Sequence, residues 1–161
     1  MTTNEHRFSA AALVASSGAL LLVALAGCAA GTTQTASPQV ARAEALRFLH
    51  HTEQIVDVQW PNTPDPVAER CNGGVRFAYT VVVTADNDAQ ANAEAFADFW
   101  TSEGLSVSST ETDFGSEGNR LYSATAERDS GPRAAYQLSA TSLAVEVRSG
   151  CAEGSIDDYD E

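Results

Sequence analysis

The chain has 161 residues and a formal net charge of −13, and this acidic composition excludes some partners. Nucleic-acid binding depends on Lys and Arg side chains that neutralise phosphates, and electrostatic docking to anionic lipid headgroups needs the same charges. We therefore expect no nucleic-acid partner. All nine basic residues are arginine, which together with the many alanines indicates a high-GC genome.

The N-terminal stretch has the layout of a bacterial lipoprotein signal sequence. An uncharged run of mainly Ala, Leu, Val and Ser ends at Leu25-Ala26-Gly27-Cys28. The small residues Ala26 and Gly27 let the chain lie extended in a signal peptidase, which would recognise them together with Leu25. Cys28 supplies the thiol for diacylglyceryl transfer. We expect residues 1–27 to be removed and Cys28 to carry a lipid anchor in the outer face of the cell membrane.

Two alternatives for this stretch are an uncleaved membrane span and an ordinary secretory signal. The apolar run is at the short limit for a span, and no basic stop-transfer cluster follows it. Both alternatives leave Cys28 without a purpose.

Cleavage would leave 134 residues, enough for one domain with a single core. Residues 28–37 would be the lipidated cysteine and a flexible tether of roughly 15–18 Å. Residues 38–151 would be the globular domain. Residues 152–161 are acidic and poor in apolar side chains, so we expect a disordered tail.

The globular part begins with a helix, a loop and a strand. Ser37-Pro38 is typical of a helix start, and apolar residues at helical spacing continue to about Val56. Prolines then predict a loop over residues 60–70, and Asn72-Gly73-Gly74 a turn or flexible entry. From Val75 to Thr84, alternating side chains predict a strand with Val75, Phe77, Tyr79, Val81 and Val83 on its buried face.

A second helix and four short strands complete the predicted elements. Asp88 and Gly104 are typical cap residues for a helix from Ala89 to Glu103. Alternating stretches separated by turn residues then predict strands at 105–112, 120–128, 134–140 and 143–148, which would form an antiparallel meander.

This order predicts an α+β fold, with two helices on one face of a mostly antiparallel five-stranded sheet. If the second helix is a right-handed crossover, the first two strands run in the same direction. The fifth strand is then antiparallel to the first and adjacent to it, which brings Cys71 and Cys151 to the same edge. With Cys28 lipidated, these two remaining cysteines can form a disulfide in an oxidising compartment.

Few residues suggest chemistry. His50-His51 with Glu53 and Asp57 is the cluster most like a metal site, but adjacent helical residues point about 100° apart, so a solvated helix end is favoured. Calcium could be proposed for Asp86-Asn87-Asp88 or for the acidic run Asp157-Asp158-Tyr159-Asp160-Glu161. Neither has EF-hand spacing, and we expect turn and cap chemistry for the first and a solvated tail for the second.

We predict no metal, no cofactor and no catalytic residue. The serines lack a nucleophile elbow, and Cys71 and Cys151 fit a bridge better than a thiolate nucleophile. Trp60, Tyr122 and Tyr136 are the aromatic residues least clearly assigned to the core. Trp60 could form a binding edge, or it could fold back as a lid.

The chain resembles the small lipoproteins of high-GC Gram-positive bacteria. The likeness rests on Leu25-Ala26-Gly27-Cys28 and on a cysteine pair that encloses a helix ending in Phe99-Trp100-Thr101-Ser102-Glu103-Gly104. It implies an envelope location and carries over no catalytic residue. The acidic tail is a departure from this layout.

We therefore expect a lipid-anchored, non-enzymatic domain that binds an envelope protein, a wall polymer or a small ligand. One alternative is a small-ligand carrier or accessory subunit, which a cavity between the second helix and the sheet would favour. An exposed aromatic patch over a filled core would favour the binding module. An envelope hydrolase is the least favoured alternative, and three polar side chains converging in a cleft would support it.

Overall fold

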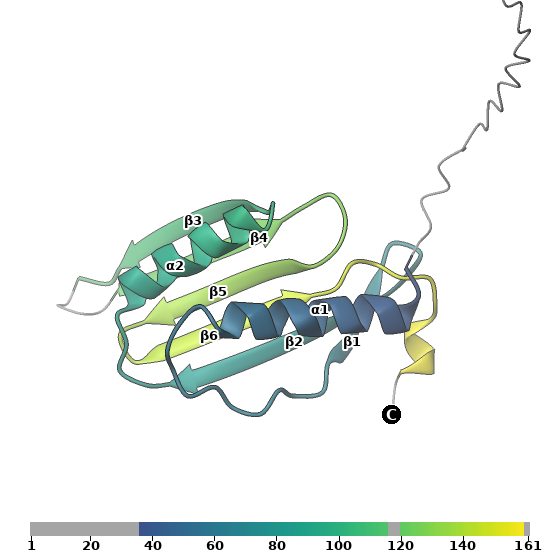
Figure 1. Cartoon of the computed structure of the whole chain (residues 1–161), viewed down its shortest axis with the longest axis horizontal. Coiled ribbons are helices and arrows are strands. Elements are labelled where there is room, and N and C mark those ends of the chain that lie inside the picture. Colours follow the sequence, from purple (N-terminus) through teal and green to yellow (C-terminus); the bar gives the residue numbers. More distant parts are fainter. Residues whose placement is uncertain (1–35, 116–119, 160–161) are drawn as a thin grey trace, which may run out of the picture. The chain divides into compact units, whose positions relative to one another are not determined.

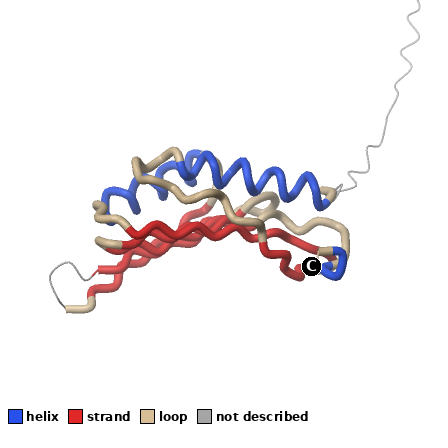
Figure 2. Tube along the Cα trace, turned by 90° about the horizontal axis from the view of Figure 1, so that it is seen from below, coloured by secondary structure: helices blue, strands red, loops and turns tan. Residues whose placement is uncertain are grey.

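The fold is known from a computed structural model, which describes residues 36–115 and 120–159. Two helices cover one face of a six-stranded antiparallel sheet and leave the other face open (Figures 1 and 2). The helices are α1 (Pro38–Glu53) and α2 (Ala89–Ser102). The strands are β1 (Val67–Cys71), β2 (Gly74–Thr84), β3 (Ser106–Asp113), β4 (Arg120–Glu127), β5 (Arg133–Ser139) and β6 (Ser142–Arg148).

The strand order β1-β2-β6-β5-β4-β3 confirms the predicted architecture. β3 to β6 form the antiparallel meander, and β6 pairs with β2, so the first and last predicted strands are neighbours. Four antiparallel pairings lead from β2 through β6, β5 and β4 to β3. Because an even number of reversals restores the direction, β2 and β3 run the same way, as expected for strands joined by a crossover helix.

The predicted loop over residues 60–70 is wrong at its end, because residues 67–71 form β1. This strand pairs with β2 through the two-residue turn Asn72-Gly73, and Gly73 has a positive φ of 84°. Asn-Gly is a preferred pair for such tight hairpin turns, which need left-handed backbone conformations. The sheet therefore has six strands and not five.

The prediction of a disordered tail over residues 152–161 is also wrong for residues 152–159. Ala152 is fully buried, and its backbone N–H and carbonyl form hydrogen bonds with the carbonyl and N–H of Val75. A 3₁₀ turn, η1 (Ile156–Asp158), follows, and the Tyr159 ring lies edge-on to Phe77 with 5.0 Å between centroids. Gly74 permits this arrangement, because a Cβ at position 74 would collide with the carbonyl oxygen of Ala152.

The helices begin and end where cap chemistry directs. The Ser37 side chain accepts a hydrogen bond from the Val40 amide at the start of α1, and Asp88 accepts one from Ala91 at the start of α2. Gly104, with a φ of 82°, follows the C-cap of α2 as predicted. α1 ends at Glu53, three residues before the predicted limit at Val56.

The core lies between the helices and the covered sheet face. The five predicted inward residues of β2 are all buried, while Val82 on the opposite face is 55% exposed. A buried chain of hydrogen bonds joins the two helices. The Trp100 Nε1–H of α2 donates to Thr52 Oγ at 3.2 Å, and that hydroxyl donates to the Phe48 carbonyl at 3.0 Å.

Replacing Thr52 with Val should destabilise the fold by about 1–3 kcal/mol, because it leaves the buried Trp100 N–H without an acceptor. Thr52→Ser is the matched control, since it keeps the hydroxyl and loses one methyl group, worth about 1 kcal/mol. Urea unfolding of both variants measures the difference. Equal stability of Thr52→Val and the wild type would contradict this role for Thr52.

The predicted disulfide is present. Cys71 at the end of β1 is bonded to Cys151, with 6.0 Å between their Cα atoms and a sequence separation of 80. The bridge joins the β1–β2 hairpin to the segment that leaves β6, at one edge of the sheet.

Loss of this bridge in a Cys71→Ser/Cys151→Ser double variant should reduce the free energy of unfolding by about 2–4 kcal/mol, as is typical for a bond that closes a long loop. Thermal unfolding of the variant and of the wild type, with and without reductant, measures the effect. Labelling of two accessible thiols in the native wild-type protein would show that the bond does not form.

Candidate functional site

A cleft of about 1380 Å³ lies between α1, the β4–β5 turn and the disulfide-linked end of the sheet. α1 contributes Arg47, Phe48 and His51 to its lining, and the turn contributes residues 128–133. Ser149, Gly150 and the disulfide line the cleft where β6 ends. The helix periodicity places residues 44, 47, 48 and 51 of α1 on this side.

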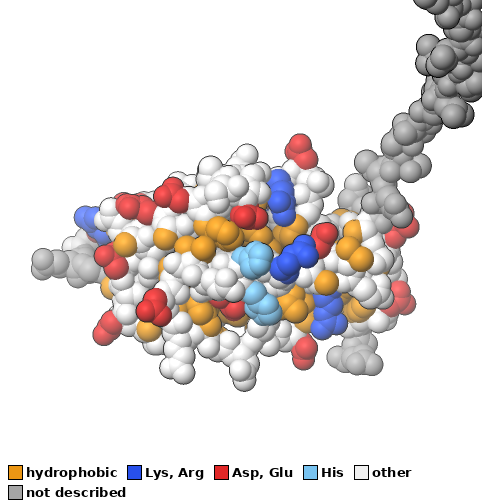
Figure 3. Space-filling view, in the orientation of Figure 1, with side chains coloured by type: hydrophobic (Ala, Val, Ile, Leu, Met, Phe, Trp, Pro, Cys, Tyr) orange, Lys and Arg blue, Asp and Glu red, His pale blue; other side chains and the backbone are white. Residues whose placement is uncertain are grey.

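The lining of the cleft contains more arginines than acidic residues, although the chain as a whole is acidic. Five of the eight arginines in the described residues line it, against three acidic residues, Glu44, Glu103 and Asp129. The arginines come from three separate segments: α1 supplies one, the β1–β2 hairpin two and the β4–β5 hairpin two. In Figure 3, Arg and His side chains gather in the middle of the face shown, over and beside α1.

Arg128 is held in a defined position on the wall of the cleft. Its guanidinium carbon lies 5.9 Å from the centroid of the Phe48 ring, and its Nη1 donates to the Glu103 carbonyl at 3.4 Å. A Cβ at Gly131 would lie 3.0 Å from its Nε, so the glycine turn allows the guanidinium to lie directly against the backbone. That Nε is buried and has no acceptor in the part of the chain that the structure describes.

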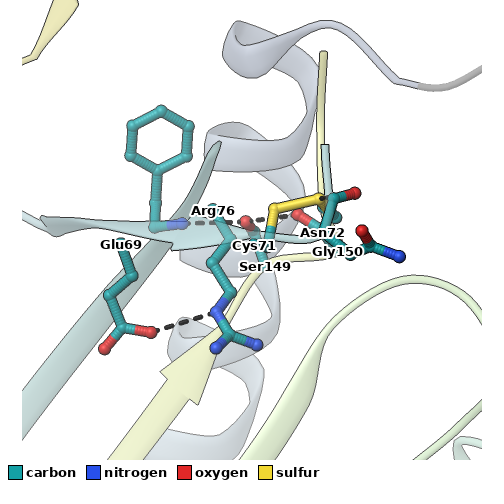
Figure 4. The surroundings of a disulfide bond; sticks show 8 residues. Glu69, Cys71, Asn72, Arg76, Ser149 and Gly150 are labelled. Carbon is teal, nitrogen blue, oxygen red and sulfur yellow. Dashed lines mark hydrogen bonds and ion pairs between the residues drawn. A yellow bond between two sulfur atoms is a disulfide. The ribbon is translucent and has the colours of Figure 1, made fainter. Parts of the chain in front are cut away.

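The other arginines of the cleft fall into two groups. Arg76 pairs with Glu69 at 3.0 Å, and Arg133 pairs with Glu127 at 3.5 Å, both on the open face of the sheet. Figure 4 shows the Arg76–Glu69 pair beside Cys71 and Ser149. Arg47 and Arg70 are exposed, and no carboxylate of the described residues lies within 4.0 Å of either side chain.

The two histidines of the predicted cluster lie on different sides of α1. His50 Nε2 lies 3.1 Å from the Thr63 hydroxyl, whereas His51 faces the cleft. Within residues 36–115 and 120–159, no group of three or more His, Cys, Asp and Glu side chains could hold a metal ion. Sequence spacing alone therefore grouped residues that the fold directs to different neighbours.

The acidic motifs have structural roles where they are described. Asp88 caps α2, and Asn87 Nδ2 donates to the carbonyls of Ala85 and Ser139, at 3.0 and 3.1 Å. In η1, the Ser155 hydroxyl accepts from the Asp157 amide. Asp160 and Glu161 lie outside the described residues.

The three unassigned aromatic residues pack on the core. The Trp60 indole donates to the Glu53 carbonyl at 2.6 Å and lies partly buried over α1, so it is folded back as a lid. Tyr136 is buried and donates to the Ala93 carbonyl at 3.3 Å, and Tyr122 packs against the same cluster. Phe96, Trp100 and Tyr136 fill the space between α2 and the sheet, where a small-ligand carrier would need its pocket.

The lipidation residue Cys28 and the recognition residues Leu25, Ala26 and Gly27 lie outside the described residues. No helix within the described ranges is long and apolar enough to cross a membrane. Cys71 and Cys151 are engaged in the disulfide and are not free nucleophiles.

Comparison with known proteins gives a distant structural similarity. No family model matches the chain, and no curated protein matches it. A solved structure of a DUF4853 family protein from Actinomyces odontolyticus is similar, with a TM-score of 0.44 and 16% identity. The similarity covers 73% of this chain and 66% of that one, so the matched region is less than two thirds of the neighbour's length.

Glu53 at the end of α1 is the described acid most affected by burial. Desolvation raises the pKa of its carboxyl above the ordinary value of 4.5, and the charge of His50 partly opposes this. One carboxyl oxygen, Oε1, is buried without a hydrogen-bond partner among the described residues.

Glu53→Gln should therefore stabilise the protein at pH 7, by about 1 kcal/mol or less for a group that is only partly buried. A raised folded-state pKa gives stability that is fully present below the unfolded-state pKa and lost as pH rises through the folded-state value. The advantage of the Gln variant should thus disappear below about pH 4. Melting temperatures from pH 3 to 8 measure this, and a pH-independent difference would contradict it.

Proposed function

We propose that this protein is a lipid-anchored, extracytoplasmic binding protein whose ligand site is the arginine-lined cleft. The observation that carries the proposal is that five arginines line one large cleft of a protein with net charge −13, and that three of them have no carboxylate within 4.0 Å among the described residues. A few polar or charged side chains that line one hollow are typical of a recognition site. Stability alone would not require the arginines to share a cleft, since ion pairs scattered over the surface would stabilise an acidic fold equally well.

The cysteines support export and anchoring. Cys71 and Cys151 are bonded to each other, and such bonds persist in oxidising compartments outside the cytoplasm. Cys28 is then the one cysteine of the chain left over, and it stands at the end of a lipobox. Two or three acyl chains on this residue would hold the protein stably in the membrane.

Binding fits the cleft better than hydrolysis. Arginine side chains stay protonated, so they serve neither as nucleophiles nor as general bases. His51, the histidine of the cleft, makes no hydrogen bond to a Ser or Cys side chain among the described residues, and a nucleophile needs an adjacent base to activate it. A carrier with its pocket beneath α2 has less support, because aromatic side chains fill that interface.

Replacing Cys28 with Ser should release the protein from the membrane fraction or leave it unprocessed. The wild-type chain, and an Ala30→Ser control that leaves the lipobox unchanged, should stay with membranes and be digested by protease added to intact, wall-free cells. Membrane flotation with immunoblotting measures both properties. Normal anchoring of the Cys28→Ser variant would overturn the anchored location.

A further inference from the structure

We propose that the cleft binds a ligand with two or more phosphate or carboxylate groups, and that Arg128 is the central contact. The inference rests on the proposed function, since it names the ligand class of the same site. It depends on two observations: how the arginine side chains of the cleft are held, and which of them have no carboxylate partner.

Arg128 is preorganised for an oxyanion. The Phe48 ring lies on one side of its guanidinium and the Gly131 turn lies against it, while the Glu103 carbonyl accepts from Nη1. A guanidinium fixed in this way loses little conformational entropy on binding, and its planar fork matches the two oxygens of a carboxylate or phosphate. No carboxylate of the described residues lies within 4.0 Å of it.

Buried Nε–H groups without acceptors are rare in folded proteins and call for a physical reason. In Arg128 this donor is unsatisfied among the described residues, although Glu103 and Asp129 line the same cleft and no ion pair with Arg128 forms. A side chain held only to close the β4–β5 turn would gain from pairing with either acid. Its position against a ring and a glycine leaves its charge without a carboxylate partner among the described residues.

The number of free charges points to an oligoanion. Arg47 on α1 and Arg70 on β1 are exposed and have no carboxylate within 4.0 Å among the described residues, so with Arg128 they give three unpaired guanidinium groups. A single small anion would neutralise one of them. The cleft, at about 1380 Å³, is above the usual range of roughly 300–1,000 Å³ for small-molecule pockets, which leaves room for several anionic groups.

The net charge of the protein makes this inference specific. At neutral pH a chain with a sequence pI of about 4.4 repels anions at long range. Binding of an oligoanion therefore cannot arise from general ion exchange and must come from short-range contacts in the cleft. Such contacts are weakened by salt less than exposed ones, because ions at about 0.15 M screen mainly beyond roughly 8 Å.

The test is calorimetric titration of the full chain in non-ionic detergent. Tripolyphosphate and tricarballylate are the oligoanion probes, and orthophosphate and acetate carry one anionic group. We expect saturable 1:1 binding of at least one oligoanion, with a Kd at least tenfold lower than that of its single-group control. The proposal would be overturned if neither oligoanion showed saturable binding at ligand concentrations up to 1 mM. It would also be overturned if the single-group probes bound with the same affinity as the oligoanions.

Variants locate the site. Arg128→Gln should weaken oligoanion binding at least tenfold, and Arg128→Lys should recover only part of the loss because it restores charge without the fork. Arg120→Gln is the matched control, since Arg120 lies outside the cleft and pairs with Glu111 and Asp113. Arg47→Gln changes an exposed side chain and should weaken binding even if the Arg128 variants unfold. Equal affinity of the Arg47, Arg120 and wild-type proteins would overturn the assignment.

A further arm separates the source of the anionic groups. Phosphatidylglycerol vesicles present one phosphate on each headgroup, so preference for these vesicles over tripolyphosphate would overturn the oligoanion proposal. The inference and the proposed function can fail separately. An anchored protein that binds neither oligoanion would remove the ligand class alone, whereas a protein that binds tripolyphosphate but is absent from membranes would remove the anchored location alone.

Discussion

The antiparallel pairing of β2 with β6 is the constraint on which the rest of the structure depends. It joins the first long strand to the last one, so β3, β4 and β5, which come between them in sequence, lie on the other side of β6 from β2. Beyond β6 the chain stays with β2, because Ser149 donates to the Phe77 carbonyl and Ala152 pairs with Val75. The disulfide fixes the same edge covalently.

The cleft is a consequence of this pairing. The pairing of β5 with β6 ends at Arg133 and Arg148. Beyond this pair the two strands separate: the chain after β6 follows β2, whereas the chain before β5 turns back to β4. The gap between the two hairpins is covered on one side by α1. Gly131 and Gly150 allow the separated segments to approach each other again, since a Cβ at Gly150 would lie 3.4 Å from the Gly131 backbone. The site is thus built where two strands part.

The architecture could be predicted from the sequence because period-two alternation, cap residues and turn glycines are local signals, and the cysteine pair agreed with the strand directions. β1 was missed because prolines precede it and it has few apolar residues, although Asn72-Gly73 was a usable hairpin signal. The ordered tail depends on Gly74 meeting Ala152, a contact across 78 positions that no local pattern reveals. The arginine cleft escaped for the same reason, since its five arginines are spread from position 47 to position 133.

The net charge describes the surface as a whole and does not describe the cleft. A net charge of −13 over 161 residues does not give the sign of the charge at one site. The interaction of a charged ligand with a site is governed by the charges within about 8–10 Å of it. Here some acidic side chains cap a helix or pair with arginines on the open face, while Glu44, Glu103 and Asp129 line the cleft. Among the described residues, the three arginines that pair with no carboxylate all line this one cleft, so an anion that reaches it meets guanidinium groups that the composition does not reveal.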